Sequence, residues 1–200
     1  ACAPFRRLHL CDKNLEQIKA QQITTHNLLA EVCLAAKYEG DLIKTHYPKH
    51  EQTNNDSASQ LCTVLARSFA DIGDIIRGKD LYLGGRGRDQ LESNLRKIFA
   101  KIYKDVTNGG KNGELQERYK DDTANYYQLR EDWWDANRAT VWKAITCEAN
   151  GTYFRATCGS SGETPHVTPS RCRCSDNPNT DPPTYFDYVP QFLRWFEEWA

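Results

Sequence analysis

A chain of 200 residues is long enough to bury a hydrophobic core of its own. Although 26% of its residues are charged, 11% are aromatic, a content that excludes an intrinsically disordered chain. The net charge of -1 excludes no class of partner, but the charges are segregated along the chain. Eight basic and three acidic residues lie between Arg77 and Lys104, whereas seven acidic and three basic residues lie between Glu114 and Asp135.

Eight cysteines in so polar a chain favour disulfides in an exported protein over a set of reduced core thiols. The sequence contains no signal peptide and no apolar run long enough to span a membrane. It lacks methionine, opens on Ala1 and closes at Ala200 inside a predicted helix. We therefore interpret it as a fragment of a longer polypeptide, whose terminal cysteines can have partners outside it.

The first half of the chain predicts helices separated by polar segments. Apolar residues recur at helical spacing from Leu15 to about Tyr38, which predicts one long or kinked helix that ends before Pro48. The polar run 49–59 predicts a loop, in which Asp56 or Ser57 caps the next helix. The apolar face of that next helix consists of Leu61, Cys62, Leu65, Phe69 and Ile72.

Glycine-rich breaks at 78–87 and 108–113 bracket a strongly periodic helix over 91–106. Its apolar residues recur every three or four positions, and the opposite face is basic. The apolar set is Leu91, Leu95, Ile98, Phe99, Ile102 and Val106, and the basic set is Arg96, Lys97, Lys101 and Lys104.

The stretch 126–147 predicts the most aromatic helix, with Trp133 and Trp134 side by side. Neighbouring positions on a helix point about 100° apart, so both indoles can be buried only if this helix packs against partners on two sides. We therefore expect Trp133, Trp134 and Trp142 to be core anchors. Residues 149–183 predict a long loop stapled by cysteines, and Pro190 opens a last helix that runs into Ala200.

Histidine and cysteine patterns give no support for a metal site. His46 and His50 have the four-residue spacing of helical metal ligands, but Pro48 between them favours a loop. A zinc set could in principle be formed, but the single residue between its last two cysteines is a shorter spacing than zinc sites use. The members of that set are Cys158, His166, Cys172 and Cys174.

Catalysis also lacks support. Asp71 and Asp74 lie one helical turn apart, where a structural salt bridge or a helix-end role is favoured over shared acid–base chemistry. No nucleophile motif is present. We expect a protein that is not an enzyme, with no catalytic residue, metal or cofactor.

The basic region has two interpretations. It is either a solvated helix face balanced by the acidic segment downstream, or a patch that binds sulfated or sialylated glycans through charge and bidentate hydrogen bonds. Nucleic acid is excluded as a partner because the disulfides place the protein outside the cell. The candidate ligand-binding residues are Arg77, Lys79, Arg86, Arg88, Arg96, Lys97, Lys101 and Lys104.

Four motifs in order resemble the hallmarks of Duffy-binding-like adhesion domains. The opening run from Cys2 to Cys11 resembles their Cys-x-Pro-x-Arg-Arg-x-x-Leu-Cys signature. The run 71–78 with Asp80, the paired tryptophans with Trp142, and the run 190–199 resemble the other three. The sequence of 77–83 and that of the last helix are most similar to the alpha class in the variant erythrocyte membrane protein 1 antigens of malaria parasites.

This resemblance implies a mostly α-helical adhesion module with long disulfide-stapled loops. Residues 1–48 would contain the end of the first subdomain and the helix leading into the second. Residues 49–200 would form the helical second subdomain, with a Cys-rich loop at 149–183 and a truncated bridging helix at 190–200. The module would lie on the extracellular face of the infected erythrocyte membrane, anchored only through regions outside this fragment.

The family also implies a function and a cysteine pairing. Its members bind host cell-surface receptors, either glycans or glycoproteins, and the alpha class is associated with rosetting through heparan sulfate-like glycans. The alternative is a structural and antigenic spacer, with receptor binding carried elsewhere. Cys2 and Cys11 would pair with upstream partners, Cys62 with Cys158 or Cys147, and Cys33 with the other of these two. The structural disulfide candidates are Cys33, Cys62, Cys147, Cys158, Cys172 and Cys174.

Overall fold

The computed structural model describes residues 2–23, 25–54, 60–82, 85–107, 113–122, 124–147, 149, 151, 153, 155–159, 164–168, 171–174 and 182–200. The side chains of residues 25, 26, 48–54 and 85–87 lie outside this description. Its helices are α1 (Phe5–Leu8), α2 (Lys13–Glu16), α3 (Thr25–Asn54), α4 (Leu61–Arg77), α5 (Gly85–Thr107), α6 (Gly113–Tyr119), α7 (Tyr127–Thr146), the 3-10 helix η1 (Phe186–Tyr188) and α8 (Gln191–Trp199).

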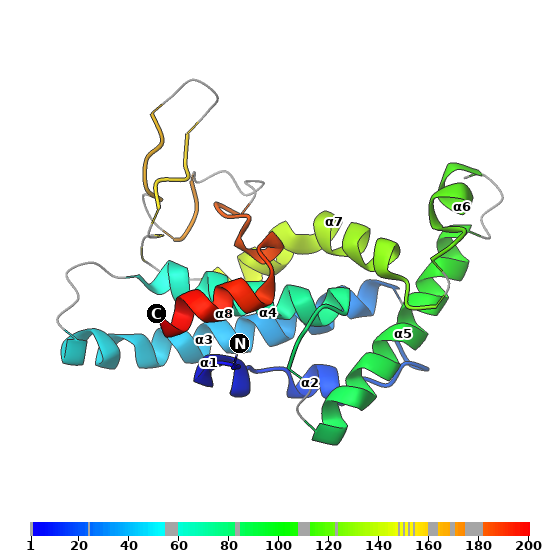
Figure 1. The fold of residues 1–200 in the computed structure, drawn as a ribbon, viewed down its shortest axis with the longest axis horizontal. Coiled ribbons are helices and arrows are strands. Elements are labelled where there is room, and N and C mark those ends of the chain that lie inside the picture. The colour runs from blue at the N-terminus through cyan, green and yellow to red at the C-terminus, as the bar shows by residue number, and fades with distance from the viewer. Residues whose placement is uncertain are drawn as a thin grey trace.

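Three long helices, α3, α4 and α7, lie side by side and enclose the core (Figure 1). α4 is buried along almost its whole length. The ring of Phe69 on α4 lies 5.1 Å from the indole of Trp134 and 5.1 Å from that of Trp142, both on α7. The predicted mostly α fold is confirmed, and α4 is its central element.

Trp133 and Trp134 contact different helices, as the paired positions require. Trp134 packs on α4, where a Cβ at Gly73 would lie only 2.7 Å from its ring. Trp133 packs edge-on against Phe99 of α5, with ring centroids 6.1 Å apart. Both indoles are buried. α7 is therefore held between α4 and α5 by two adjacent side chains.

The single helix predicted from Leu15 to Tyr38 is wrong. α2 ends at Glu16, and residues 17–23 lie outside any helix before α3 begins at Thr25. The backbone of this segment finds partners on another helix, since the Asn94 amide of α5 donates to the Ile18 carbonyl at 2.8 Å. Tertiary hydrogen bonds therefore replace helical ones here.

The predicted helix end before Pro48 is also wrong, because α3 continues to Asn54. A proline removes only one helical hydrogen bond, and the long helix on either side of Pro48 is kept. Earlier in α3 the packing on α7 is so close that a Cβ at Gly40 would overlap the Ile145 carbonyl. His46 and His50 therefore lie on a helix and not in a loop. The predicted caps Asp56 and Ser57 lie outside the described residues, and the subdomain boundary at residue 48, which falls within α3, stays a prediction.

The glycine-rich break between α4 and α5 is shorter than predicted. Gly78 ends α4 with φ 73°, a left-handed conformation that favours glycine, and the Arg130 guanidinium lies 2.9 Å from where a Cβ would be. α5 already begins at Gly85. Gly85 and Gly87 thus belong to the first turn of α5 and not to a loop.

Two disulfides staple the region that follows α7, as predicted, but with different partners. Cys62 pairs with Cys172, and Cys158 pairs with Cys174. The predicted pairing of Cys62 with Cys158 or Cys147 is therefore wrong. The Trp142 indole N–H donates to the Cys172 carbonyl at 3.1 Å, which holds Cys172 in the core beside α4.

Four cysteines form no disulfide within this chain. Cys33 and Cys147, both predicted as disulfide candidates, are unpaired here, and so are Cys2 and Cys11, whose pairing with upstream partners stays a prediction. Burial raises the pKa of the Cys33 thiol above its ordinary value. Within the described part of the chain, no helix has the length and apolar character needed to cross a bilayer.

Candidate binding surface

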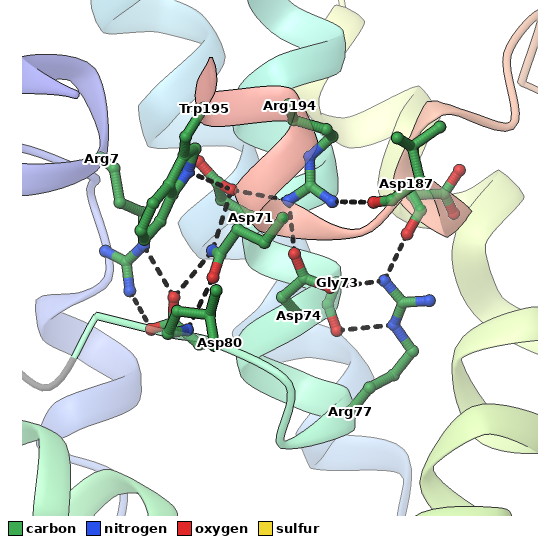
Figure 2. A network of polar contacts seen from close by, with 12 residues as sticks. Arg7, Asp71, Gly73, Asp74, Arg77, Asp80, Asp187, Arg194 and Trp195 are labelled. Carbon is green, nitrogen blue, oxygen red and sulfur yellow. Dashed lines mark hydrogen bonds and ion pairs between the residues drawn. The ribbon is translucent and has the colours of Figure 1, made fainter. Parts of the chain in front are cut away.

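The two ends of the chain meet α4 in a buried network of charged side chains (Figure 2). Asp71, which is fully buried, is its centre. It accepts hydrogen bonds from Arg6 of α1 at 2.7 Å and from Arg194 of α8 at 2.8 Å. Gln191 of α8 donates to it as well, at 3.1 Å. One carboxylate therefore fastens both terminal helices to α4.

Asp74, one turn further along α4, joins the same network. Arg77 donates to it at 2.9 Å, and Arg194 forms an ion pair with it. The structural salt bridges predicted for Asp71 and Asp74 are thus confirmed. Arg77 also donates to the Asp187 carbonyl and is only 1% exposed. Its place among the predicted ligand-binding residues is therefore wrong, because every approach to its guanidinium is filled by protein.

The two carboxylates of the network differ in pKa. Burial by itself raises the pKa of Asp71, but the positive charges of Arg6 and Arg194 outweigh burial and hold it below its ordinary value. At Asp74 burial outweighs Arg194 and Arg77 and raises the pKa to about 6. Asp71 therefore stays ionised to a lower pH than Asp74 does.

A second carboxylate centre, Asp187 of η1, connects the network to the tryptophan helix. It accepts from the Trp134 indole at 2.8 Å and from Arg138 at 2.6 and 2.9 Å. Arg138 donates in addition to the Thr184 carbonyl at 2.8 Å. The sequence analysis missed Asp187 and Arg138. The available signal was a charged residue on the apolar face of a helix, which indicates a paired buried charge.

The network leaves the apolar side of α8 facing solvent. Arg194 and Gln191 are buried, whereas Phe196 is 71% exposed. The ring of Phe5 from α1 lies beside that of Trp199, with centroids 6.2 Å apart. We call these exposed side chains the α8 apolar surface, and its members are Phe5, Phe192, Leu193, Phe196 and Trp199.

A cleft of about 750 Å³ borders the α8 apolar surface. It lies between α8, η1 and the disulfide-stapled region, and both Leu193 and Glu197 of α8 line it. Aromatic and proline side chains form part of its remaining walls, together with polar residues such as Arg155 and Thr157, and the aromatic and proline members are Tyr153, Pro182, Pro183, Tyr185 and Phe186.

The predicted basic residues do not form one surface. Lys79 forms an ion pair with Glu131 of α7, and Arg88 forms one with Asp12. Arg88 is largely buried in that pair and extends away from the solvent face of α5. The side chain of Arg86 lies outside the described residues.

The other predicted basic residues lie together on α5. Lys97, Lys101 and Lys104 are spaced by four and three residues, which places them on one helix face. Lys97 and Lys104 are exposed and form no ion pair with any described residue, whereas Lys101 donates to the Ala20 carbonyl. Arg96, beside this row, is 3.6 Å from Glu92. We call Lys97, Lys101 and Lys104 the α5 lysine row.

The comparison with known families identifies the fold. The family model described as the Duffy binding domain matches residues 1–194. The chain belongs to the Duffy binding domain family. This Duffy binding domain is similar to the double domain NTS-DBL1-alpha and CIDR-gamma of the PfEMP1 protein from the Plasmodium falciparum varO strain. The identity is 46% and the TM-score 0.79, over the whole of this chain and 27% of that chain.

Two further relatives show how widely the domain is shared. The PfEMP1 IT4var13 DBLbeta domain, solved bound to ICAM-1, is 35% identical with a TM-score of 0.70, over all of this chain and 44% of that one. The Duffy receptor beta form of Plasmodium knowlesi is 26% identical over 215 residues, which covers this whole chain and 14% of that protein. The chain thus spans less than half the length of these relatives. The resemblance to the alpha class is confirmed by the similarity to DBL1-alpha.

Proposed function

We propose that this Duffy binding domain is a host receptor-binding adhesion module on the extracellular face of the infected erythrocyte. Its membership of the family, together with a relative solved in complex with ICAM-1 that aligns over the entire chain, is the observation that carries this proposal. The buried charge network supports the role, because it holds three helices rigidly while loops and helix surfaces are left to vary.

The ligand chemistry we propose is an anionic glycan, sulfated or sialylated, of the kind that supports rosetting. The α5 lysine row supports this choice, since Lys97 and Lys104 are exposed cations with no carboxylate partner among the described residues. Clustered cations on a rigid helix attract polyanions by charge and release the counterions of the polyanion on binding. The α8 apolar surface has no comparable unpaired charge, so it is not the glycan site.

Heparin binding by the purified domain tests this proposal. The double variant Lys97→Glu, Lys104→Glu should bind heparin about tenfold more weakly or worse, because it replaces two cations by two anions. Lys101 is left unchanged because its ammonium holds the Ala20 carbonyl. The matched control is the double variant Lys13→Glu, Lys37→Glu, which makes the same charge change at exposed lysines of α2 and α3. Affinity is measured by calorimetry at several salt concentrations.

The possible outcomes separate the two functional hypotheses. A larger loss for the α5 variant than for the control supports the lysine row as a glycan site. Equal losses would show that only net charge matters, and the row would no longer be the site. The spacer hypothesis is favoured if the wild-type domain binds neither heparin nor any glycan on an array, while a longer protein that contains the domain does bind these glycans.

A further inference from the structure

A segment far from α5 in sequence lies along the α5 lysine row. Residues 17–23, which connect α2 to α3, cross α5 in Figure 1, and two side chains of α5 bind their backbone. Asn94 donates to the Ile18 carbonyl at 2.8 Å, and Lys101 donates to the Ala20 carbonyl. The two donors are seven residues, or about 10 Å, apart along α5, and their long side chains hold two carbonyls of the segment that are only two residues apart.

Lys19 lies between those two fixed points. Ile18 and Ala20 are buried, at 5% and 2% exposure, so the chain turns these neighbours inward and leaves Lys19 exposed. Lys97 occupies the stretch of α5 between Asn94 and Lys101. The backbone of Lys19 therefore lies alongside the exposed part of the lysine row, although 78 positions of sequence separate it from Lys97.

Three of the lysines gathered here are unpaired, although one carboxylate, Asp105 of α5, lies one position from Lys104 and one helical turn from Lys101. Lys19, Lys97 and Lys104 form no ion pair with any described residue, in contrast to Lys79, Arg88 and Arg96 nearby in sequence. Like charges brought together on two elements repel one another, and a bound polyanion relieves that repulsion. Lys101 is different, because its ammonium is used to hold the segment in place.

We propose that the segment 17–23 is the second side of the glycan site and that Lys19 is a binding residue in it. A sulfated polysaccharide would lie between Lys19 on one side and Lys97 with Lys104 on the other. Lys101 acts as a positioning residue, which fixes the distance between the two sides through the Ala20 carbonyl. This inference rests on the proposed glycan-binding function and adds a residue that lies outside the basic region of the sequence.

The test is heparin binding by single variants of Lys19. Lys19→Glu should weaken binding several-fold, and the slope of log affinity against log salt should fall by roughly one, because one cation fewer neutralises the polyanion. Lys19→Arg should keep both the affinity and the slope. The matched control is Lys37→Glu, which changes another exposed lysine, on α3, and should change the slope little. Equal thermal unfolding midpoints for the variants and the wild type exclude a folding defect.

Failure of this inference can be distinguished from failure of the proposed function. If Lys97→Glu, Lys104→Glu weakens heparin binding but Lys19→Glu behaves like Lys37→Glu, the lysine row stands and the second side is overturned. If the wild-type domain does not bind heparin at low salt, both are overturned. A loss on Lys19→Glu with retention in Lys19→Arg supports the two-sided site.

Discussion

α5 and α8 are both strongly amphipathic, yet they turn opposite faces toward the protein. α5 buries Leu95 and Phe99 and exposes its lysines. α8 buries Arg194 and Gln191 and exposes Phe196 and its apolar neighbours. A period of 3.6 residues therefore defines two faces of a helix but does not determine which face is buried. What decides is the surface that the rest of the fold offers.

The two helices are consequently held by different physical effects. α5 offers apolar side chains to an apolar core, so the hydrophobic effect fixes it. α8 meets the charged patch at Asp71 and Asp74 on α4, where only charged and amide side chains can satisfy the buried carboxylates. Trp195 is the one large apolar side chain that α8 buries, and its indole also faces Asp71. Three experiments test this contrast.

The largest effect is expected from Asp71→Ala. This change removes the shared partner of Arg6 and Arg194 and leaves the fully buried guanidinium of Arg194 with fewer partners. Breaking a buried pair on one side costs about 3–5 kcal/mol. Urea unfolding should show this loss, and hydrogen exchange should show α8 opening before α5. A loss below about 1 kcal/mol would show that the network does not hold α8.

Matched truncations on the two helices come next. Leu95→Ala on α5 should cost about 2–4 kcal/mol of unfolding free energy, because Leu95 is fully buried and its removal leaves a cavity. Phe196→Ser on α8 removes a larger apolar side chain but should change stability by only about 0.5 kcal/mol, since Phe196 already faces solvent. Chemical denaturation of both variants measures the difference. Equal costs would contradict the inverted orientation of α8.

The smallest effect is a difference in pH dependence between Asp71 and Asp74. The lowered pKa of Asp71 means that its contribution to stability is present above about pH 4, its unfolded pKa, and is lost as the pH falls through its folded pKa. The raised pKa of Asp74, about 6, has the opposite sign. Its contribution is present below about pH 4 and is lost as the pH rises through 6.

Urea unfolding of the wild type, Asp71→Asn and Asp74→Asn between pH 3 and 7 measures this difference. The stability advantage of the wild type over Asp71→Asn should shrink below about pH 4. Relative to Asp74→Asn, the wild type should lose stability between about pH 4 and pH 6. Differences that move in the same direction would contradict the assignment of opposite shifts.

Much of the helical core could be predicted from local pattern. The buried residues of α4 and α5 recur at helical spacing, and the adjacency of Trp133 and Trp134 already required two packing partners. Helix ends were harder to predict, because the break at 17–23 depends on a hydrogen bond from α5 and because α3 tolerates Pro48 in its interior. The disulfide partner of Cys62 is 110 residues away and was not predicted.

The candidate site was predicted only in part. Lys97 and Lys104 were found because they lie opposite the apolar face of one helix, a property that a sequence displays. Arg77 has the same charge and lies in the same basic region, but a carboxylate one turn away and a carbonyl from η1 take up its guanidinium. Lys19 gave no signal, because its proximity to α5 follows from two tertiary hydrogen bonds.

Four properties could be derived without a structure: the helical class, the amphipathic faces, the presence of disulfides and the motifs that indicate the family. These depend on spacing and residue type, which are local properties of a chain. Three properties required the folded structure: which face of α8 is buried, which basic residues pair with carboxylates, and which lysines lie near one another. Those outcomes depend on where residues distant in sequence come together in the fold. A guanidinium, for example, is structural when a buried carboxylate lies against it and is available for a ligand when none does.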